Sequence, residues 1–345
     1  MLSSIIKYSL IIALPCCLLL ASCEGDKPVP PTPAETVPEI VENPALVAAT
    51  LRIQQNPDSA QAYIDRALIH YKLVNNDAAL ADLDTALLLD KTVAKIYLLQ
   101  ADLYFAKRDI IRAIKSLETG AALLPQNKEI LLVLSRYYFY NSERDKSIKS
   151  ADAALKLDPG YAGAYFQKAL IFLEIKDTAK AISNLQTTVE QDPEFLEAYE
   201  ELGYIYKQKK NPLAIQYFRN AVKLSPRDND LRYALALALQ EQKKYNEALE
   251  EYRLMIKESP QYENAHYGMG WVYFQMDSLD KADGSFKIAI SIKPDYTDAY
   301  YMRGLIAESI GDIKNAEYYY DQTLRIDALH TNALNGFDRL KKLKK

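Results

Sequence analysis

Small and large apolar positions recur along this chain with a period of about 34 residues. One series of small residues is Ala67, Ala101, Ser135, Ala169, Gly203, Ala236, Gly270 and Gly304. A second small series is Ala79, Ala113, Ser147, Ala181, Ala214, Ala248, Ala282 and Ala316. A third, mostly large series is Leu83, Leu117, Ala151, Leu185, Phe218, Tyr252, Phe286 and Tyr320. Small residues let two helices approach closely and large ones fill the space beside them, so the pattern predicts a stack of paired antiparallel helices.

Prolines mark the ends of the predicted units with the same period. They stand at Pro125, Pro159, Pro193, Pro226, Pro260 and Pro294. A repeat in this range is typical of two-helix units that stack side by side. The sequence therefore favours an elongated helical array over a single globular enzyme core.

This pattern resembles the tetratricopeptide repeat (TPR) family over about residues 60–330. The clearest unit is the seventh, which carries Gly270, Tyr273, Ala282, Phe286, Ala289 and Pro294. The resemblance implies an all-α fold, a right-handed α-solenoid of about eight 34-residue helix-turn-helix repeats with capping helices.

One interval in the series is a residue short. The small residues Gly203 and Ala236 are separated by 33 positions, and the loss falls between Gly203 and Ala214. The turn signal Lys209-Lys210-Asn211-Pro212 lies in this stretch. We therefore expect a shortened turn between the two helices of the fifth unit.

Capping helices are expected at both ends of the repeats. At the front, within residues 45–58, Ala45 to Gln55 has apolar residues at helical spacing and ends before Pro57. At the back, residues 331–345 place Leu334, Phe337, Leu340 and Leu343 on one face. Terminal units of a repeat array need a polar outer side, which the final lysines supply.

The first 22 residues have the pattern of a secretory signal peptide. Lys7 precedes an apolar run from Leu10 to Leu20, which is too short to span a membrane. The tetrapeptide that ends at Cys23 resembles the lipobox of bacterial lipoproteins. The resemblance implies cleavage before Cys23, its lipidation, and a lipid-anchored place in the bacterial cell envelope, at the outer membrane on its periplasmic or outer face. The alternative is an ordinary signal peptide followed by an incidental cysteine.

A proline-rich tether is expected at residues 23–44. Six of the positions from Glu24 to Pro44 are proline, and large apolar residues are scarce. Such a composition cannot bury a core and favours extended polyproline geometry. The segment is either a spacer that lets the repeats reach a partner away from the lipid or a passive linker.

Candidate chemistry is sparse, so we expect neither an enzyme nor a cofactor. The net charge of −4 argues against nucleic acid, and all three cysteines lie within residues 1–23. The histidines His70, His266 and His330 belong to different parts of the array, too far apart to share a metal. His70 and His266 stand where other units carry tyrosine, so we expect both histidines to lie in the core. Acid pairs such as Glu200-Glu201 are adjacent in sequence and are interpreted as solvated faces.

In the TPR family the first helix of each unit lines the concave side of the superhelix. The positions that face a ligand there are unusually aromatic in this chain, and aromatic residues favour protein interfaces. The predicted partner-binding residues are Phe105, Phe139, Phe166, Tyr204, Tyr233, Tyr267, Trp271, Phe274 and Tyr301. The strongest candidate is the set Tyr267, Trp271 and Phe274, on one helical face. The alternative is that these rings pack between neighbouring units.

These features predict a membrane-tethered, non-catalytic scaffold. Its partner would be a peptide, disordered segment or helix of another envelope or secreted protein, bound for assembly, secretion or surface complexes. The family's clamp for chaperone tails uses lysine and asparagine at positions that are apolar or acidic here, so a terminal carboxylate is not the expected ligand. The alternative functions are an accessory or subunit of an enzyme acting on peptidoglycan or another envelope polymer, and a purely structural spacer without a ligand.

Overall fold

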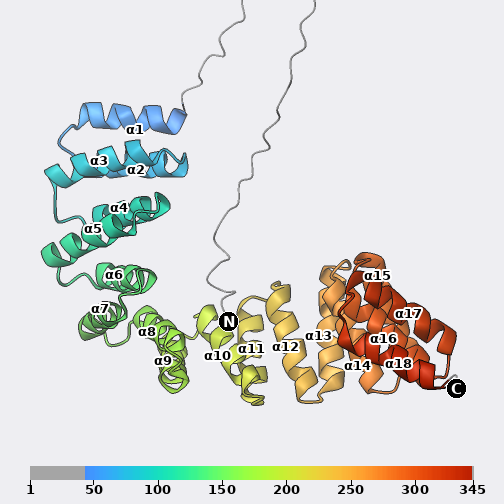
Figure 1. The fold of residues 1–345 in the computed structure, drawn as a ribbon. Coiled ribbons are helices and arrows are strands. Elements are labelled where there is room, and N and C mark those ends of the chain that lie inside the picture. The colour runs from blue at the N-terminus through green and yellow to red at the C-terminus, as the bar shows by residue number, and fades with distance from the viewer. Residues whose placement is uncertain (1–42, 344–345) are drawn as a thin grey trace, which may run out of the picture.

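The computed structural model describes residues 43–343, and these fold entirely into α-helices (Figure 1). The described range contains helices α1 to α18 and no strand. Each predicted unit is one helical hairpin, and consecutive hairpins pack against each other. The all-α repeat architecture expected from the sequence is confirmed.

The first helices of the eight units are uniform, each 13 residues long. They are α2 (Ala60–Lys72), α4 (Ala94–Ala106), α6 (Lys128–Tyr140), α8 (Ala162–Glu174), α10 (Leu196–Gln208), α12 (Asn229–Glu241), α14 (Glu263–Gln275) and α16 (Thr297–Ser309). The second helices are α3 (Asn76–Leu89), α5 (Ile110–Leu123), α7 (Arg144–Leu157), α9 (Thr178–Gln191), α11 (Leu213–Leu224), α13 (Tyr245–Glu258), α15 (Leu279–Ile292) and α17 (Ile313–Ile326).

The ends of the array are closed by α1 (Pro44–Gln55) and α18 (Thr331–Leu343). Helix α1 begins one residue earlier than expected, at Pro44. Asn43 caps it, because its side chain accepts hydrogen bonds from the backbone N–H groups of Ala45 and Leu46. Proline suits the first helical position, since its missing N–H would have had no partner there. The predicted signal peptide, Cys23 and most of the tether lie outside the described residues.

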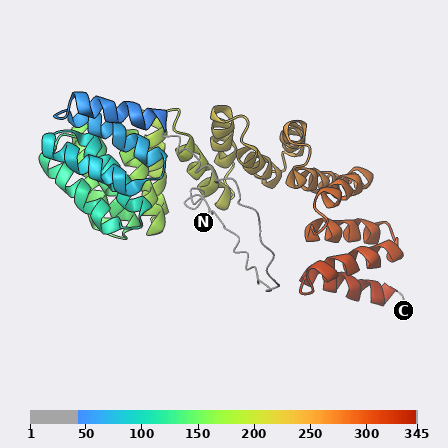
Figure 2. The same cartoon turned by 90° about the horizontal axis from the view of Figure 1, so that it is seen from above.

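The hairpins stack in chain order and the stack curves. Figure 1 shows α1 to α5 lying one above another before the array bends near α6 to α9 and continues to α18. From above, the early helices overlie one another while the later ones extend away (Figure 2). First helices of neighbouring units approach each other directly, as α6 does with α8 and α12 with α14, and second helices do so less closely. The first helices therefore form the inner side of the curve.

The paired small and large series meet inside each hairpin. Leu83, Leu117, Leu185, Phe218, Tyr252, Phe286 and Tyr320 are all fully buried. In the fifth, seventh and eighth units the small residue is a glycine that faces a ring. A Cβ added to Gly203 would come within 2.6 Å of the Phe218 ring, and one on Gly304 within 2.5 Å of the Tyr320 ring. The periodic small residues thus mark the closest approach of the two helices in each unit.

The short fifth unit differs from the prediction. Its inter-helix segment, 209–212, has four residues where the other units have three, whereas α11 has 12 residues where the other second helices have 14. Lys210 keeps the left-handed backbone that every unit uses at this point. Asn211 then accepts a hydrogen bond from the N–H of Leu213. The expectation of a shortened turn was wrong: the residue is missing from the first turn of α11.

Candidate partner-binding surface

All nine residues predicted to bind a partner lie on first helices, from α4 to α16. Two are well exposed: Phe105 at 44% and Tyr204 at 40%. The other seven are half-buried. The inner side therefore combines rings that are free to meet a ligand with rings that also pack within the array.

Four rings gather on the inner side of the early units. Phe105 of α4 stacks on Tyr140 of α6 with centroids 5.5 Å apart and meets the edge of Tyr137 at 5.3 Å. Phe139 lies 6.1 Å from Tyr140, which is itself 44% exposed. We call Phe105, Tyr137, Phe139 and Tyr140 the early aromatic cluster.

A partly buried hydrogen bond fixes this cluster. The hydroxyl of Tyr137 donates to Asp102 Oδ1 at 2.9 Å and so links α6 to α4. Burial, followed by the charge of Asp102, raises the pKa of Tyr137 well above its usual value. The tyrosine therefore stays a neutral donor, and the exposed rings beside it rest on a fixed base.

In the later units, a ring on the first helix packs against the residue 29 positions further on. Phe166 lies 4.9 Å from Phe195, Tyr267 lies 5.0 Å from Tyr296, and Tyr301 lies 5.0 Å from His330. Phe195 and Tyr296 directly precede the first helix of the next unit, and His330 directly precedes the closing helix α18. The predicted residues Phe166, Tyr267 and Tyr301 therefore also join units together. Packing between units is what the alternative interpretation expected of these rings.

Sequence reasoning missed the partner rings of these pairs. They occupy one repeat position, which reads Tyr161, Phe195, Asp228, Tyr262, Tyr296 and His330. The aromatic residues at this position share the period of the prolines, so the signal was available in the sequence.

Carboxylate and amide oxygens lie beside the later rings. The hydroxyl of Tyr262 donates to Asp230 Oδ1 at 3.2 Å, and that of Tyr296 donates to Asn264 Oδ1 at 2.9 Å. His330 Nε2 lies 3.8 Å from Asp298 Oδ1. The inner side of α10 to α16 carries a group of tyrosines and acids that we call the tyrosine–acid surface. Its members are Tyr204, Tyr233, Tyr262, Tyr267, Tyr296, Glu200, Glu201, Asp230, Glu263 and Asp298.

The negative charges act on these hydroxyls. Burial, followed by the charge of Glu200, raises the pKa of Tyr204 to about 12. Burial, followed by the charge of Asp230, raises the pKa of Tyr262 to about 12. Glu201 is itself half-buried, and burial followed by the charge of Glu200 raises its pKa. The interpretation of Glu200-Glu201 as a plain solvated face was therefore wrong for Glu201, which packs beside the tyrosines.

The strongest predicted set is more deeply packed than expected. Trp271 meets the edge of the Tyr245 ring at 6.4 Å and packs against the hydrophobic clusters of two neighbouring units. Phe274 packs against the cluster that contains Met302 and Ile306. Truncating Trp271 or Phe274 would therefore disturb the joint between units as well as any ligand contact.

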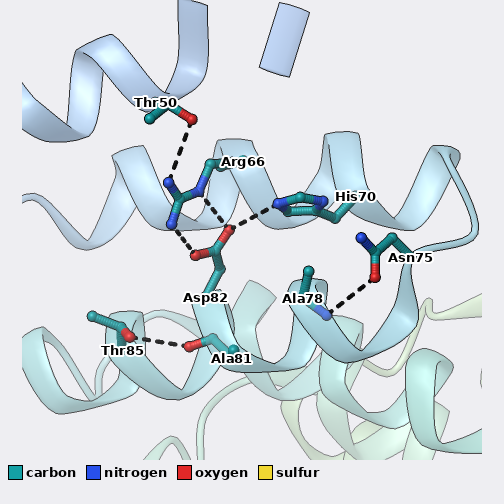
Figure 3. Close-up of polar contacts among 8 residues, drawn as sticks. All are labelled: Thr50, Arg66, His70, Asn75, Ala78, Ala81, Asp82 and Thr85. Atoms are coloured by element: carbon teal, nitrogen blue, oxygen red, sulfur yellow. Dashed lines mark hydrogen bonds and ion pairs between the residues drawn. The ribbon is translucent and has the colours of Figure 1, made fainter. Parts of the chain in front are cut away.

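A polar network joins the front cap to the first unit (Figure 3). The Arg66 guanidinium donates to both carboxylate oxygens of the buried Asp82, at 2.9 and 2.6 Å, and also to Thr50 Oγ1 of α1 at 3.4 Å. His70 Nε2 lies 3.9 Å from the same carboxylate. His266 is buried and its Nε2 lies 3.0 Å from the Pro260 carbonyl oxygen. Both histidines sit inside hairpins, as core histidines should.

Within the described part of the chain, no three His, Cys, Asp or Glu side chains are placed to hold a metal ion together. None of the helices between residues 43 and 343 combines the length and apolar character needed to cross a membrane. The features that stand out are the two inner aromatic regions.

An all-helical array of repeated hairpins with an aromatic inner side defines a helical-repeat protein. The family model described as Tetratricopeptide repeat matches residues 98–162, 132–194, 166–219, 206–263 and 267–330. These matches together span more than half of the chain, which therefore belongs to the tetratricopeptide repeat family. Proteins of this family generally serve as scaffolds for protein–protein interaction. No curated protein matches the chain.

The chain is also similar to several solved structures. The C-terminal part of a TPR repeat-containing protein from Cytophaga hutchinsonii is 19% identical with a TM-score of 0.58, over 68% of this chain and 97% of that one. A tetratricopeptide repeat protein from Parabacteroides merdae is 18% identical with a TM-score of 0.45, over 72% and 98%. MamA is 19% identical with a TM-score of 0.39, over 43% and 86%. The likeness to the Cytophaga structure concerns the fold.

Proposed function

We propose that this protein is a lipid-anchored, non-catalytic scaffold that holds a peptide or helix of another envelope protein on its inner side. The observation that carries the proposal is the exposure of Phe105, Tyr140 and Tyr204 on the inner side of the curve. Large exposed rings on a rigid base suit binding, because they offer contact area at a low entropic cost. The partner serves assembly, secretion or a surface complex.

The binding region for an apolar segment is the early aromatic cluster. Phe105 and Tyr140 are stacked and exposed, whereas Tyr137 beneath them is buried and hydrogen-bonded to Asp102. A partner side chain that covers the two exposed rings buries apolar area without moving the helices. Such a preformed aromatic surface suits an amphipathic helix or an extended segment.

Photocrosslinking in native cells tests the binding region. The photoreactive residue p-benzoylphenylalanine replaces Phe105 in one strain, and in a control strain it replaces Leu88, an 83% exposed residue near the end of the second helix α3. We expect one defined protein to crosslink at position 105 and not at position 88. Identical products at both positions, or none at 105, would count against the scaffold function.

The proposed anchor is tested separately. Cleavage before Cys23 and lipidation of its sulfur rest on the Leu20-Ala21-Ser22-Cys23 pattern. Several acyl chains hold a protein firmly, whereas a single chain is marginal. Mass spectrometry of the mature N-terminus is expected to show diacylglycerol and an acyl group on Cys23, and Cys23→Ser is expected to abolish membrane attachment. An unmodified thiol at the mature terminus would refute the anchor and leave the scaffold function intact.

A further inference from the structure

The tyrosine–acid surface is continuous across four units. The rings of Tyr267 and Tyr296 stack at 5.0 Å, and the rings of Tyr233 and Tyr262 lie 6.3 Å apart in the preceding unit. Tyr204 extends the surface to the fifth unit, close to Asp230 of the sixth. The repeat thus places similar groups side by side along the inner side of α10, α12, α14 and α16.

Exposed carboxylates follow the same line. The side chain of Asp298 is 62% exposed, Asp230 is exposed, and Glu263 is half-exposed. Each belongs to the first turn of a successive first helix, so one carboxylate stands in each of three consecutive units. Glu200 and Glu201 continue the negative charge into α10. The surface therefore favours a positively charged ligand.

The rings at these positions already accept cations from the chain itself. Lys293 Nζ lies 5.3 Å from the centroid of the Tyr296 ring. At the equivalent ring of the third unit, Lys128 Nζ lies 4.7 Å from the centroid of Tyr161. A tyrosine face attracts an ammonium or guanidinium group through its ring quadrupole, and nearby carboxylates add to the attraction. Both parts of such a site are present in each of the later units.

The spacing between neighbouring units favours an extended ligand. Packed helices lie about 8–10 Å apart, and an extended chain in polyproline II geometry has three residues per turn and advances about 3.1 Å per residue, so every third side chain returns to the same face after about 9 Å. A cationic side chain at every third residue of an extended segment therefore meets one unit after another. The inner side of α10 to α16 offers this match of charge and spacing, and the early aromatic cluster does not.

We propose that the tyrosine–acid surface binds an extended polypeptide segment with lysine or arginine at about every third position. This inference rests on the proposed scaffold function and assigns the chemistry of one partner segment. The basic side chains pair with Asp230, Glu263 and Asp298 and lie against the tyrosine rings beside these carboxylates.

Fluorescence anisotropy with the full-length protein in detergent tests the proposal. The probe is a labelled (Lys-Gly-Ser)n peptide, and the comparison probes are a peptide with the same lysines grouped at one end and a (Glu-Gly-Ser)n peptide. The site variant is Asp230→Asn, Glu263→Gln and Asp298→Asn together. The matched control is Glu250→Gln, Asp277→Asn and Asp280→Asn, which removes the same charge from exposed residues outside the surface.

We expect the spaced lysine peptide to bind more tightly than both comparison peptides. The site variant is expected to weaken binding about tenfold, from three pairs of about 0.5 kcal/mol each, and the control less than about twofold. Higher salt is expected to weaken binding, because the groups are exposed. Equal losses in both triple variants would show a response to net charge alone and would overturn the proposal. Absence of binding by the spaced lysine peptide would also overturn the proposal. Equal affinity of the protein for spermine and for the spaced lysine peptide would overturn it as well.

Two further measurements separate the possible failures. Circular dichroism melting shows whether each triple variant folds. If the site variant does not fold, the single variants Glu263→Gln and Asp298→Asn are measured in its place. If the crosslinker at Phe105 captures a partner but the lysine peptide does not bind, the cationic segment is wrong and the scaffold function stands. If position 105 captures nothing and the peptide does not bind, both fail.

Discussion

The ring of Phe286 occupies the space where a side chain on Gly270 would stand. A Cβ on Gly270 would lie 2.7 Å from Phe286 Cε1, closer than real atoms approach. In the first unit the same two positions hold Ala67 and Leu83, both buried. At this contact the fifth, seventh and eighth units pair a glycine with a ring, whereas the sixth pairs Ala236 with Tyr252, whose ring instead lies against Gly268.

Gly270→Ala is expected to destabilise the array. Alanine is favoured over glycine in a helix by about 1 kcal/mol, but overpacking a core costs about 1–3 kcal/mol. We expect a net loss of about 1 kcal/mol in the free energy of unfolding, measured by urea denaturation. Gly284→Ala is the control, because no atom lies within 4 Å of a Cβ placed there, and it is expected to stabilise.

The contact itself is tested by adding Phe286→Leu to Gly270→Ala. The double variant recreates the Ala67–Leu83 pair, so we expect it to be more stable than the sum of the single effects by about 1 kcal/mol. Strict additivity would show that the glycine is required for another reason.

The sequence predicted the inside of each hairpin better than the joints between hairpins. Contacts such as Gly270 with Phe286 lie within one repeat, so every unit repeats them and the period reveals them. The packing of Tyr267 on Tyr296 depends on the angle at which one unit meets the next. The half-burial of Glu201 has the same origin. A residue's place on its helix follows from spacing, but its exposure on the inner side depends on that angle.

Backbone strain at the hairpin turns supplies a second prediction. Every first helix is followed by a left-handed residue, which is Val74 (φ 59°) in the first unit and Gly311 (φ 77°) in the last. Such a backbone is costly for a β-branched residue and free for glycine. Val74 is 79% exposed and contributes little packing. Val74→Gly is therefore expected to raise the free energy of unfolding by about 1 kcal/mol.

The reciprocal change at the last unit provides the control. Gly311→Val introduces the same strain where a Cβ would meet no atom within 4 Å, so any loss of stability comes from the backbone alone. Thermal unfolding is expected to shift in opposite directions for the two variants. A shift in the same direction would contradict the explanation.

The network around Asp82 predicts that the front cap depends on one arginine. Arg66 pairs with both oxygens of Asp82 and also contacts Thr50 of α1. Asp82 is only 4% exposed, and leaving a buried charge without its partner costs about 3–5 kcal/mol. Because Arg66 is partly exposed, we expect Arg66→Leu to cost about 2 kcal/mol. Hydrogen exchange is expected to show faster exchange of the α1 amides.

Removing the carboxylate tests the cause. The double variant Arg66→Leu with Asp82→Leu buries no unpaired charge, so it is expected to be more stable than Arg66→Leu alone. Thr50→Val is expected to affect only α1, since its bond to Arg66 is the long one at 3.4 Å. Equal stability of the single and double leucine variants would mean that the ion pair is not what holds this end together.

Glu201 gives a prediction with a definite pH dependence. Burial, followed by the charge of Glu200, raises its pKa in the folded protein. The contribution of the protonated carboxyl to stability is therefore complete below its unfolded pKa of about 4.3 and is lost as pH rises through the folded value. At neutral pH the ionised Glu201 opposes folding. Glu201→Gln keeps the shape without the charge, so we expect it to raise the melting temperature at neutral pH.

The gain should vanish in acid, where Glu201 is already protonated. Melting temperatures of the wild type and Glu201→Gln at about pH 7 and about pH 3.5 measure this difference. Glu250→Gln is the matched control, because Glu250 is exposed and its replacement should change the melting temperature little at either pH. A gain of equal size for Glu201→Gln at both pH values would show that packing of the amide, and not removal of a buried charge, stabilises the variant.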